Sequence, residues 1–155
     1  MKKISKFNAG IVSPIYILLL MLLVACGGNT TDKAIFAPEG SKLTVNPTSS
    51  AFTGLTGTVR QDVVVYLNDK DGIPLHGKTI TVSASFAAPY TPFLYQMYDK
   101  NTNAPMLSPF NARINDYGIY EFYLLIPATS YFDPDNLNIT SGAATPASMT
   151  LSNTP

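Results

Sequence analysis

The chain has 155 residues, with ten basic and ten acidic side chains, one histidine, one cysteine and no tryptophan. Beyond the mostly apolar first 25 residues, seven basic side chains stand against ten acidic ones, which is a net charge of −3. This balance argues against a basic surface for nucleic acid, so no nucleic acid is expected as a partner, and the remaining chain is long enough for one domain.

The first segment has the organisation of a secretory signal peptide. Lys2, Lys3 and Lys6 precede an apolar run from Ile15 to Val24. A membrane-spanning helix needs about 20 apolar residues, whereas the apolar core of a signal peptide needs about 7 to 15. Residues 1–25 are therefore predicted to be a signal peptide that is cleaved.

The end of this segment, Leu23-Val24-Ala25-Cys26, resembles the lipobox of bacterial lipoproteins. The resemblance implies that a lipidated Cys26 becomes the first residue of the mature protein and anchors it in a lipid bilayer. In the sorting rule of that family an aspartate after the cysteine favours the inner membrane. Gly27 therefore favours the outer membrane where a bacterium has two membranes. The alternative is a free thiol at Cys26, near the end of an uncleaved helix.

Residues 26–40 are mostly small or polar and show little periodicity. This composition predicts a lipidated, flexible tether, with the folded domain at residues 41–155. An alternative is that residues 34–38 add a short edge strand to the domain. No cysteine follows Cys26, so the stability of the domain must come from its core.

From residue 41 onward the apolar pattern repeats every second residue, and prolines interrupt any long helix. Ile80, Val82, Ala84 and Phe86 alternate with small polar residues, which indicates one buried and one exposed face. Residues 118–126 are mostly apolar in both alternating sets, which indicates a central strand covered on both faces. The predicted fold is an all-β, antiparallel β-sandwich of about seven strands, at 42–46, 57–67, 78–86, 93–98, 118–126, 137–140 and 148–151.

Two turn signatures mark where two of these strands begin. Glycine supplies a positive φ, aspartate side chains cap the amides of a turn, and proline has its φ already set. The first signature precedes the strand at 78–86 and the second precedes the strand at 118–126; the residues are Asp69, Asp71, Gly72 and Pro74, then Asp116 and Gly118.

These residues resemble the bacterial Ig-like domains of invasin- and intimin-type surface proteins. A strand at 63–67 is followed by Asp-x-x-Gly-x-Pro at 69–74, by Gly77 and by an alternating strand from Ile80. The block at 115–118 is again followed by an alternating strand, and the segments 137–142 and 148–151 match closing strands rich in Thr and Ser. The resemblance implies an Ig-like sandwich for most of residues 42–151.

The order Asp116-x-Gly118-x-Tyr120-x-Phe122 also resembles the tyrosine corner of immunoglobulin domains. That resemblance implies a hydrogen bond from the Tyr120 phenol to the backbone upstream. The chain departs from antibody-like domains because it lacks tryptophan and a disulfide pair. Residues 87–110 also replace a connection that is usually shorter, which leaves one strand position open.

No set of side chains suited to catalysis or metal binding stands out. His76 has neither a nucleophile motif nor further histidine or cysteine ligands, and the only glutamates are Glu39 and Glu121. Asp133 and Asp135, like the aspartates at 69 and 71, could offer oxygen atoms to calcium, but they lack the EF-hand spacing and turn capping explains them. The sequence therefore predicts a protein that is not an enzyme, with no cofactor and no metal.

Residues 86–98 are rich in aromatic side chains, with Tyr90, Phe93, Tyr95 and Tyr98 beside two prolines. One interpretation is a strand that packs these rings on the core, and the other is a contact surface. The predicted function is that of a cell-envelope lipoprotein whose Ig-like domain is a structural or protein-contact module, with an envelope or surface protein as its partner. The alternative is a carbohydrate- or ligand-binding module that uses residues 86–98, and a third hypothesis is an accessory to an enzyme.

Overall fold

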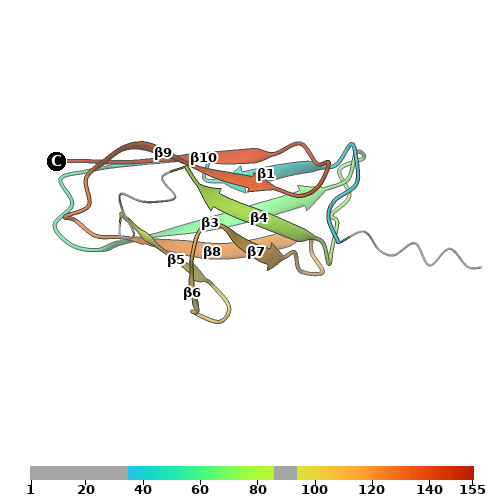
Figure 1. The fold of residues 1–155 in the computed structure, drawn as a ribbon, viewed down its shortest axis with the longest axis horizontal. Coiled ribbons are helices and arrows are strands. Elements are labelled where there is room, and N and C mark those ends of the chain that lie inside the picture. Colours follow the sequence, from blue (N-terminus) through green and yellow to red (C-terminus); the bar gives the residue numbers. More distant parts are fainter. Residues whose placement is uncertain (1–34, 86–93) are drawn as a thin grey trace, which may run out of the picture. The chain divides into compact units, whose positions relative to one another are not determined.

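Two five-stranded sheets pack face to face in the computed structural model, which describes residues 35–85 and 94–155 (Figure 1). The all-β sandwich predicted from the sequence is confirmed, but with ten strands in place of about seven. The strands are β1 (Lys42–Asn46), β2 (Ser49–Thr53), β3 (Val59–Asn68), β4 (Thr79–Ala84), β5 (Gln96–Asp99), β6 (Pro105–Met106), β7 (Phe110–Arg113), β8 (Ile119–Ile126), β9 (Phe132–Thr140) and β10 (Ala147–Thr154).

The strand order is that of an Ig-like sandwich. The first sheet has the order β1-β3-β8-β5-β6, and the second has the order β2-β10-β9-β4-β7. All pairs are antiparallel except β2 with β10, which is parallel. The first four strands of the first sheet correspond to the A-B-E-D order of immunoglobulin domains, and β10-β9-β4 correspond to G-F-C.

The core lies between the sheets, where alternate side chains of both inner faces meet. The first sheet contributes apolar side chains of β3 and β8, and the second contributes those of β4, β9 and β10. The fully buried members include Val63, Val65, Leu67, Ile80, Val82, Phe122, Leu124, Ile126, Leu137, Ile139, Met149 and Leu151.

The seven predicted strands overlap seven of the ten, and β1 has the predicted bounds. The three others, β2, β6 and β7, are short. β2 consists of small and polar residues with one phenylalanine, and it is a strand because β10, which is distant in the sequence, pairs with it. Such long-range pairing leaves no local pattern in the sequence.

The folded domain begins earlier than residue 41, which corrects the predicted boundary. Ala37 is buried, and its amide donates to Ser141 Oγ at 3.0 Å. The amide of Thr79 donates to the carbonyl of Ile35 at 2.7 Å. The compact unit that contains the sandwich extends over Ala34–Pro155. Residues 35–38 are attached by these separate hydrogen bonds and are not a strand.

The predicted signal peptide and Cys26 lie outside the described residues. Within residues 35–85 and 94–155 there is no helix with the length and apolar character needed to cross a bilayer.

Two turns at one end of the sandwich are built by short polar side chains. Asp69 Oδ1 accepts from the amides of Asp71 and Ile73 at 2.8 and 2.9 Å. Asn115 Oδ1 accepts from the amides of Tyr117 and Ile119 at 2.9 and 3.0 Å. The capping expected of Asp71 and Asp116 is therefore carried by Asp69 and Asn115, because a side chain at the first position of a turn faces the amides that follow.

The two turns pack against each other through Gly118. This residue has a φ of 77°, and a Cβ atom placed on it would lie 2.6 Å from Cβ of Pro74. Gly72 has a similar φ of 84° but has nothing within 4 Å of such a Cβ. Alanine substitutions at Gly72 and Gly118 can therefore be compared. The first introduces only backbone strain, and the second adds a steric clash.

We predict that Gly118→Ala lowers the free energy of unfolding by about 3 kcal/mol or more, because it adds a clash to a strained φ. Gly72→Ala should cost only about 1 kcal/mol, since an alanine there meets the strain alone. Urea unfolding of both variants measures the difference. Equal losses would contradict the close packing of the two turns.

Candidate binding site

The inserted segment at 87–110 crosses from one sheet to the other and back. The chain leaves β4 in the second sheet, forms β5 and β6 beside β8 in the first sheet, and returns as β7 to pair with β4. In Figure 1 the hairpin of β5 and β6 stands out at one edge of the domain. Tyr90 and Phe93 of the predicted contact surface lie outside the described residues.

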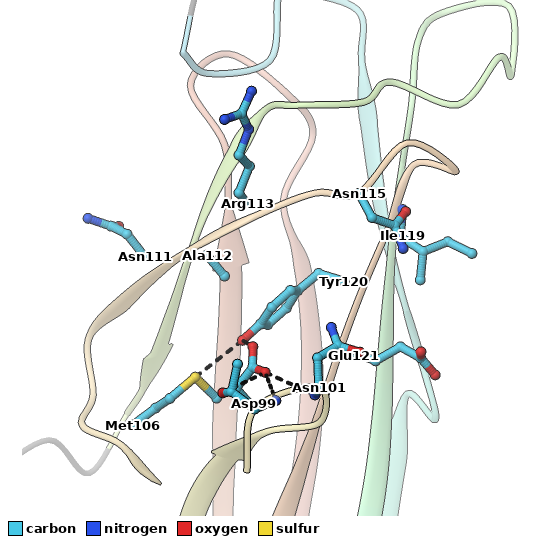
Figure 2. Close-up of a pocket in the computed structure, with 11 residues that line it drawn as sticks. Asp99, Asn101, Met106, Asn111, Ala112, Arg113, Asn115, Ile119, Tyr120 and Glu121 are labelled. Atoms are coloured by element: carbon cyan, nitrogen blue, oxygen red, sulfur yellow. Dashed lines mark hydrogen bonds between the residues drawn. The ribbon is translucent and has the colours of Figure 1, made fainter. Parts of the chain in front are cut away.

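A pocket of about 400 Å³ opens between this hairpin, β7 and the start of β8 (Figure 2). Its walls are about equally polar and apolar and come from three separate parts of the chain. They consist of Asp99, Asn101, Thr102 and Met106 from the hairpin, Asn111, Ala112 and Arg113 from β7, and Asn115, Ile119, Tyr120 and Glu121 from the following turn and β8.

Asp99, the last residue of β5, shapes the turn of the hairpin. Its Oδ1 accepts from the amides of Asn101 and Thr102 at 2.9 and 2.8 Å and from the Thr102 hydroxyl at 3.0 Å. Its carbonyl accepts from the amide of Asn103, which has a φ of 55°. Side-chain capping and a left-handed asparagine are the usual means of closing such a turn.

The other carboxylate oxygen of Asp99 fastens the hairpin to β8. Tyr120, which is buried, donates its hydroxyl to Asp99 Oδ2 at 2.9 Å and lies 3.2 Å from Met106 Sδ (Figure 2). Burial raises the pKa of the Tyr120 phenol, and the neighbouring Asp99 carboxylate raises it further. Burial by itself would raise the pKa of Asp99, but hydrogen bonds from Thr102, Tyr120 and Asn101 outweigh it and hold that pKa below its usual value.

This geometry corrects the predicted tyrosine corner. The Tyr120 phenol bonds to the side chain of Asp99 and not to upstream backbone. In immunoglobulin domains the corner tyrosine belongs to strand F, whereas β8 lies between β3 and β5, in the position of strand E. From that position the phenol faces the inserted hairpin.

The outer face of the first sheet carries a row of stacked side chains on the neighbouring strands β5, β8 and β3. Tyr98 and Tyr123 pair across the strands with ring centroids 5.2 Å apart and an interplanar angle of 7°. Arg60 places its guanidinium carbon 3.9 Å from the centroid of the Tyr123 ring and pairs with Asp62 at 2.8 Å. We call Arg60, Tyr98 and Tyr123 the aromatic row. The stacked rings and the guanidinium over the Tyr123 ring are two favourable contacts that order the row.

The aromatic row adjoins the rim of the pocket. Lys100 pairs with Glu121 at 2.7 Å further along the same strands, and Glu121 also lines the pocket. The hydroxyl of Tyr123 lies 3.3 Å from Asn103 Oδ1 in the hairpin turn. The row and the pocket therefore form one continuous candidate surface around the hairpin.

Tyr95 occupies a different environment from Tyr98. Its ring lies 5.8 Å from that of Phe132 and packs against the core, and its hydroxyl donates to the buried carboxylate of Asp135. Burial raises the pKa of the Tyr95 phenol, and the hydrogen bond to Asp135 raises it further. Of the two described contact candidates, Tyr95 thus has a packing role and Tyr98 faces outward.

The remaining turn residues lie near the pocket or at its end of the sandwich. Gly77 has a φ of 68°, and a Cβ atom placed on it would lie 3.3 Å from a guanidinium nitrogen of Arg113, so the glycine leaves room for the arginine. Asp71 pairs with Lys70 at 2.7 Å on the surface. His76 is exposed.

The chemistry that these groups offer is hydrogen bonding and charge recognition. Asp99 stays ionised near neutral pH, and both of its oxygens already accept hydrogen bonds. Arg113 lines the pocket and belongs to no ion pair among the described residues. No group of three or more His, Cys, Asp or Glu side chains suited to a metal occurs within 35–85 and 94–155.

The sequence pattern did not single out Asp99, Arg113, Arg60 or Tyr123. The sequence shows a run of polar residues at 99–103, but the partners of their side chains depend on which strand lies beside β5. That neighbour is fixed only by the crossing of the insert between the sheets.

Comparisons with known proteins find similar folds in proteins of different kinds. No family model matches the chain, and no curated protein matches it. Among solved structures, the adhesin InvE of Yersinia pseudotuberculosis is similar over 79% of this chain and 29% of its own, with 14% identity and a TM-score of 0.40. A family 123 glycoside hydrolase from Clostridium perfringens is similar over 73% of this chain and 26% of its own, with 10% identity and a TM-score of 0.37.

The Calx CBD1 domain is similar over 73% of this chain and 96% of its own, with 11% identity and a TM-score of 0.28. The chain thus spans less than a third of the adhesin and of the hydrolase that it resembles. Similarities of this size support no assignment of function.

Proposed function

We propose that the chain is a lipid-anchored protein of the bacterial cell envelope whose Ig-like domain acts through contact with a second envelope or surface protein, and not as an enzyme. Cys26 is the anchor, and the bilayer it enters is the outer membrane where a bacterium has two. The domain needs no cofactor for this function.

The aromatic row is the observation that carries the proposal of contact. Tyrosine and arginine are enriched at the centres of protein interfaces, where rigid side chains lose little conformational entropy on binding. Tyr98 and Arg60 are held in place through Tyr123 before any partner arrives. A surface ordered in advance in this way binds with a smaller entropic cost.

A small hydroxylated ligand, such as a carbohydrate, is the second candidate partner. The pocket favours it because side-chain amides and Arg113 line a concave surface close to the aromatic row. Such groups donate and accept hydrogen bonds with hydroxyl groups.

The anchor predicts that growth with labelled palmitate marks the protein in cells. Cys26→Ala should abolish the label and leave a precursor with its leader attached, because the cysteine is both the site of lipidation and the first residue after cleavage. Gel analysis of labelled membranes measures both results. Label that persists in Cys26→Ala would contradict the anchor.

The proposed contact with a second protein predicts a crosslink at Tyr98 and not at an exposed tyrosine elsewhere. Replacing Tyr98 with photoreactive benzoylphenylalanine in the full chain should give a discrete adduct with one envelope protein after illumination of cells. The same replacement of Tyr131, which is exposed in the connection between β8 and β9, is the control. Equal adducts at both positions would contradict a specific contact, and glycan-array binding without any adduct would favour the second candidate.

A further inference from the structure

Exposed apolar side chains gather at one end of the domain. Six large apolar residues are exposed in the described part of the chain, and four of them lie on the loops of that end. Three of the four are strongly exposed: Tyr117 at 78%, Ile35 at 66% and Ile73 at 61%. The fourth is Phe36, at 42%. We call these four residues the apolar end.

The contacts of the loops hold these residues close together. Ile73 and Tyr117 are each next to a partner of the tight contact between Pro74 and Gly118. Ile35 is attached through its carbonyl to Thr79, which begins β4 after the first turn. Phe36 borders the turn between β9 and β10, where a Cβ added to the glycine at 142 would lie 2.8 Å from Cβ of Phe36. Figure 1 shows these segments together at the end opposite the labelled C-terminus.

This end is also where the chain enters the domain from the proposed anchor. Cys26 precedes Ile35 by nine residues. Nine residues span at most about 30 Å when fully extended and about 17 Å as a flexible coil. A lipidated Cys26 therefore keeps the apolar end within a short distance of the bilayer surface.

We propose that the apolar end docks on the surface of the lipid bilayer that holds Cys26, with Ile73 and Tyr117 in the interfacial layer. The proposal rests on the lipid anchor of the proposed function. Tyrosine favours the membrane interface because its ring is apolar and its hydroxyl remains hydrated, and isoleucine gains from leaving water. The domain then has one orientation on the membrane, with the apolar end in contact with the bilayer and the opposite end pointing away from it.

The attraction is apolar and not electrostatic. Lys70, next to the first turn, is paired with Asp71 at 2.7 Å. The other charged residues near these loops have both signs: Lys42 and Lys78 are basic, and Glu39, Asp69 and Asp116 are acidic. Carboxylates near an anionic membrane offset the attraction of the lysines. We therefore expect docking on vesicles of zwitterionic phosphatidylcholine.

A single tryptophan tests the docking because the natural chain has none. The full, lipidated chain carrying Tyr117→Trp is reconstituted in phosphatidylcholine vesicles with brominated acyl chains, which quench tryptophan near the membrane. We expect strong quenching and a blue-shifted emission relative to the same protein in vesicles without bromine. Ile73→Trp should give the same result from the neighbouring turn.

The matched control is Tyr131→Trp. Tyr131 is an exposed aromatic residue, at 54%, and it lies in the connection between β8 and β9, at the opposite end of the sandwich. Its tryptophan should stay unquenched and emit as in water.

Flotation of the vesicles in a density gradient separates this proposal from the anchor on which it rests. Protein that floats while the tryptophan of Tyr117→Trp and that of Ile73→Trp stay unquenched overturns the docking and leaves the anchor in place. Quenching that is equal at positions 117 and 131 overturns the fixed orientation. Protein that fails to float overturns the anchor, and the docking with it.

Discussion

The place of β8 in the middle of the first sheet is the constraint on which the rest of the domain depends. Its inner face places Phe122, Leu124 and Ile126 in the core, fully buried. Its outer face carries Tyr123, which is covered by Tyr98 and Arg60. The other outward residues of β8 are half-buried. The backbone groups of such a strand are largely shielded from water, so they need hydrogen-bond partners on both edges.

The insert at 87–110 supplies the second of those edges. β3 pairs with one side of β8, and β5 pairs with the other. The insert therefore leaves the second sheet, adds β5 and β6 to the first, and returns as β7. The hydrogen bond between Asp99 and Tyr120 joins the turn of the hairpin to β8, and the pocket lies where β7 passes back over that junction. The candidate surface thus forms because β5 and β6 of the insert complete the first sheet.

The apolar end proposed to dock on the membrane and the candidate contact surface lie in different parts of the domain. The apolar end lies where the chain enters, on the turns around Pro74 and Gly118. The aromatic row lies on the outer face of the first sheet, across β3, β8 and β5. A domain that rests on its apolar end leaves this face clear of the membrane and open to a neighbouring protein. The two proposals are therefore compatible with each other.

Local patterns predicted the frame of the fold, and long-range pairing decided the rest. Alternation in β4 and the two-sided apolar pattern of β8 identified these strands because each pattern reports directly on which faces are buried. β2 was missed because its five residues carry no such pattern, and only its pairing with β10 makes it a strand. The predicted hydrogen-bond partner of the Tyr120 phenol was wrong for the same reason, since Asp99 comes close to Tyr120 only through the pairing of β5 with β8. Lipidation of Cys26 stays a prediction from four residues and their place in the chain.

Asp99 and Tyr120 fasten the inserted hairpin to β8, and a double-mutant cycle tests this link most directly. Urea unfolding would be measured for Tyr120→Phe, for Asp99→Ala and for the double variant, with Tyr98→Phe as a control. Within residues 35–85 and 94–155 the Tyr98 hydroxyl bonds only to the exposed Gln96, at 2.7 Å. We predict that Tyr120→Phe costs about 1 to 2 kcal/mol, that the two substitutions are coupled by about 1 kcal/mol or more, and that Tyr98→Phe costs less than about 0.5 kcal/mol. Effects of the two substitutions that add within about 0.5 kcal/mol would contradict the claim.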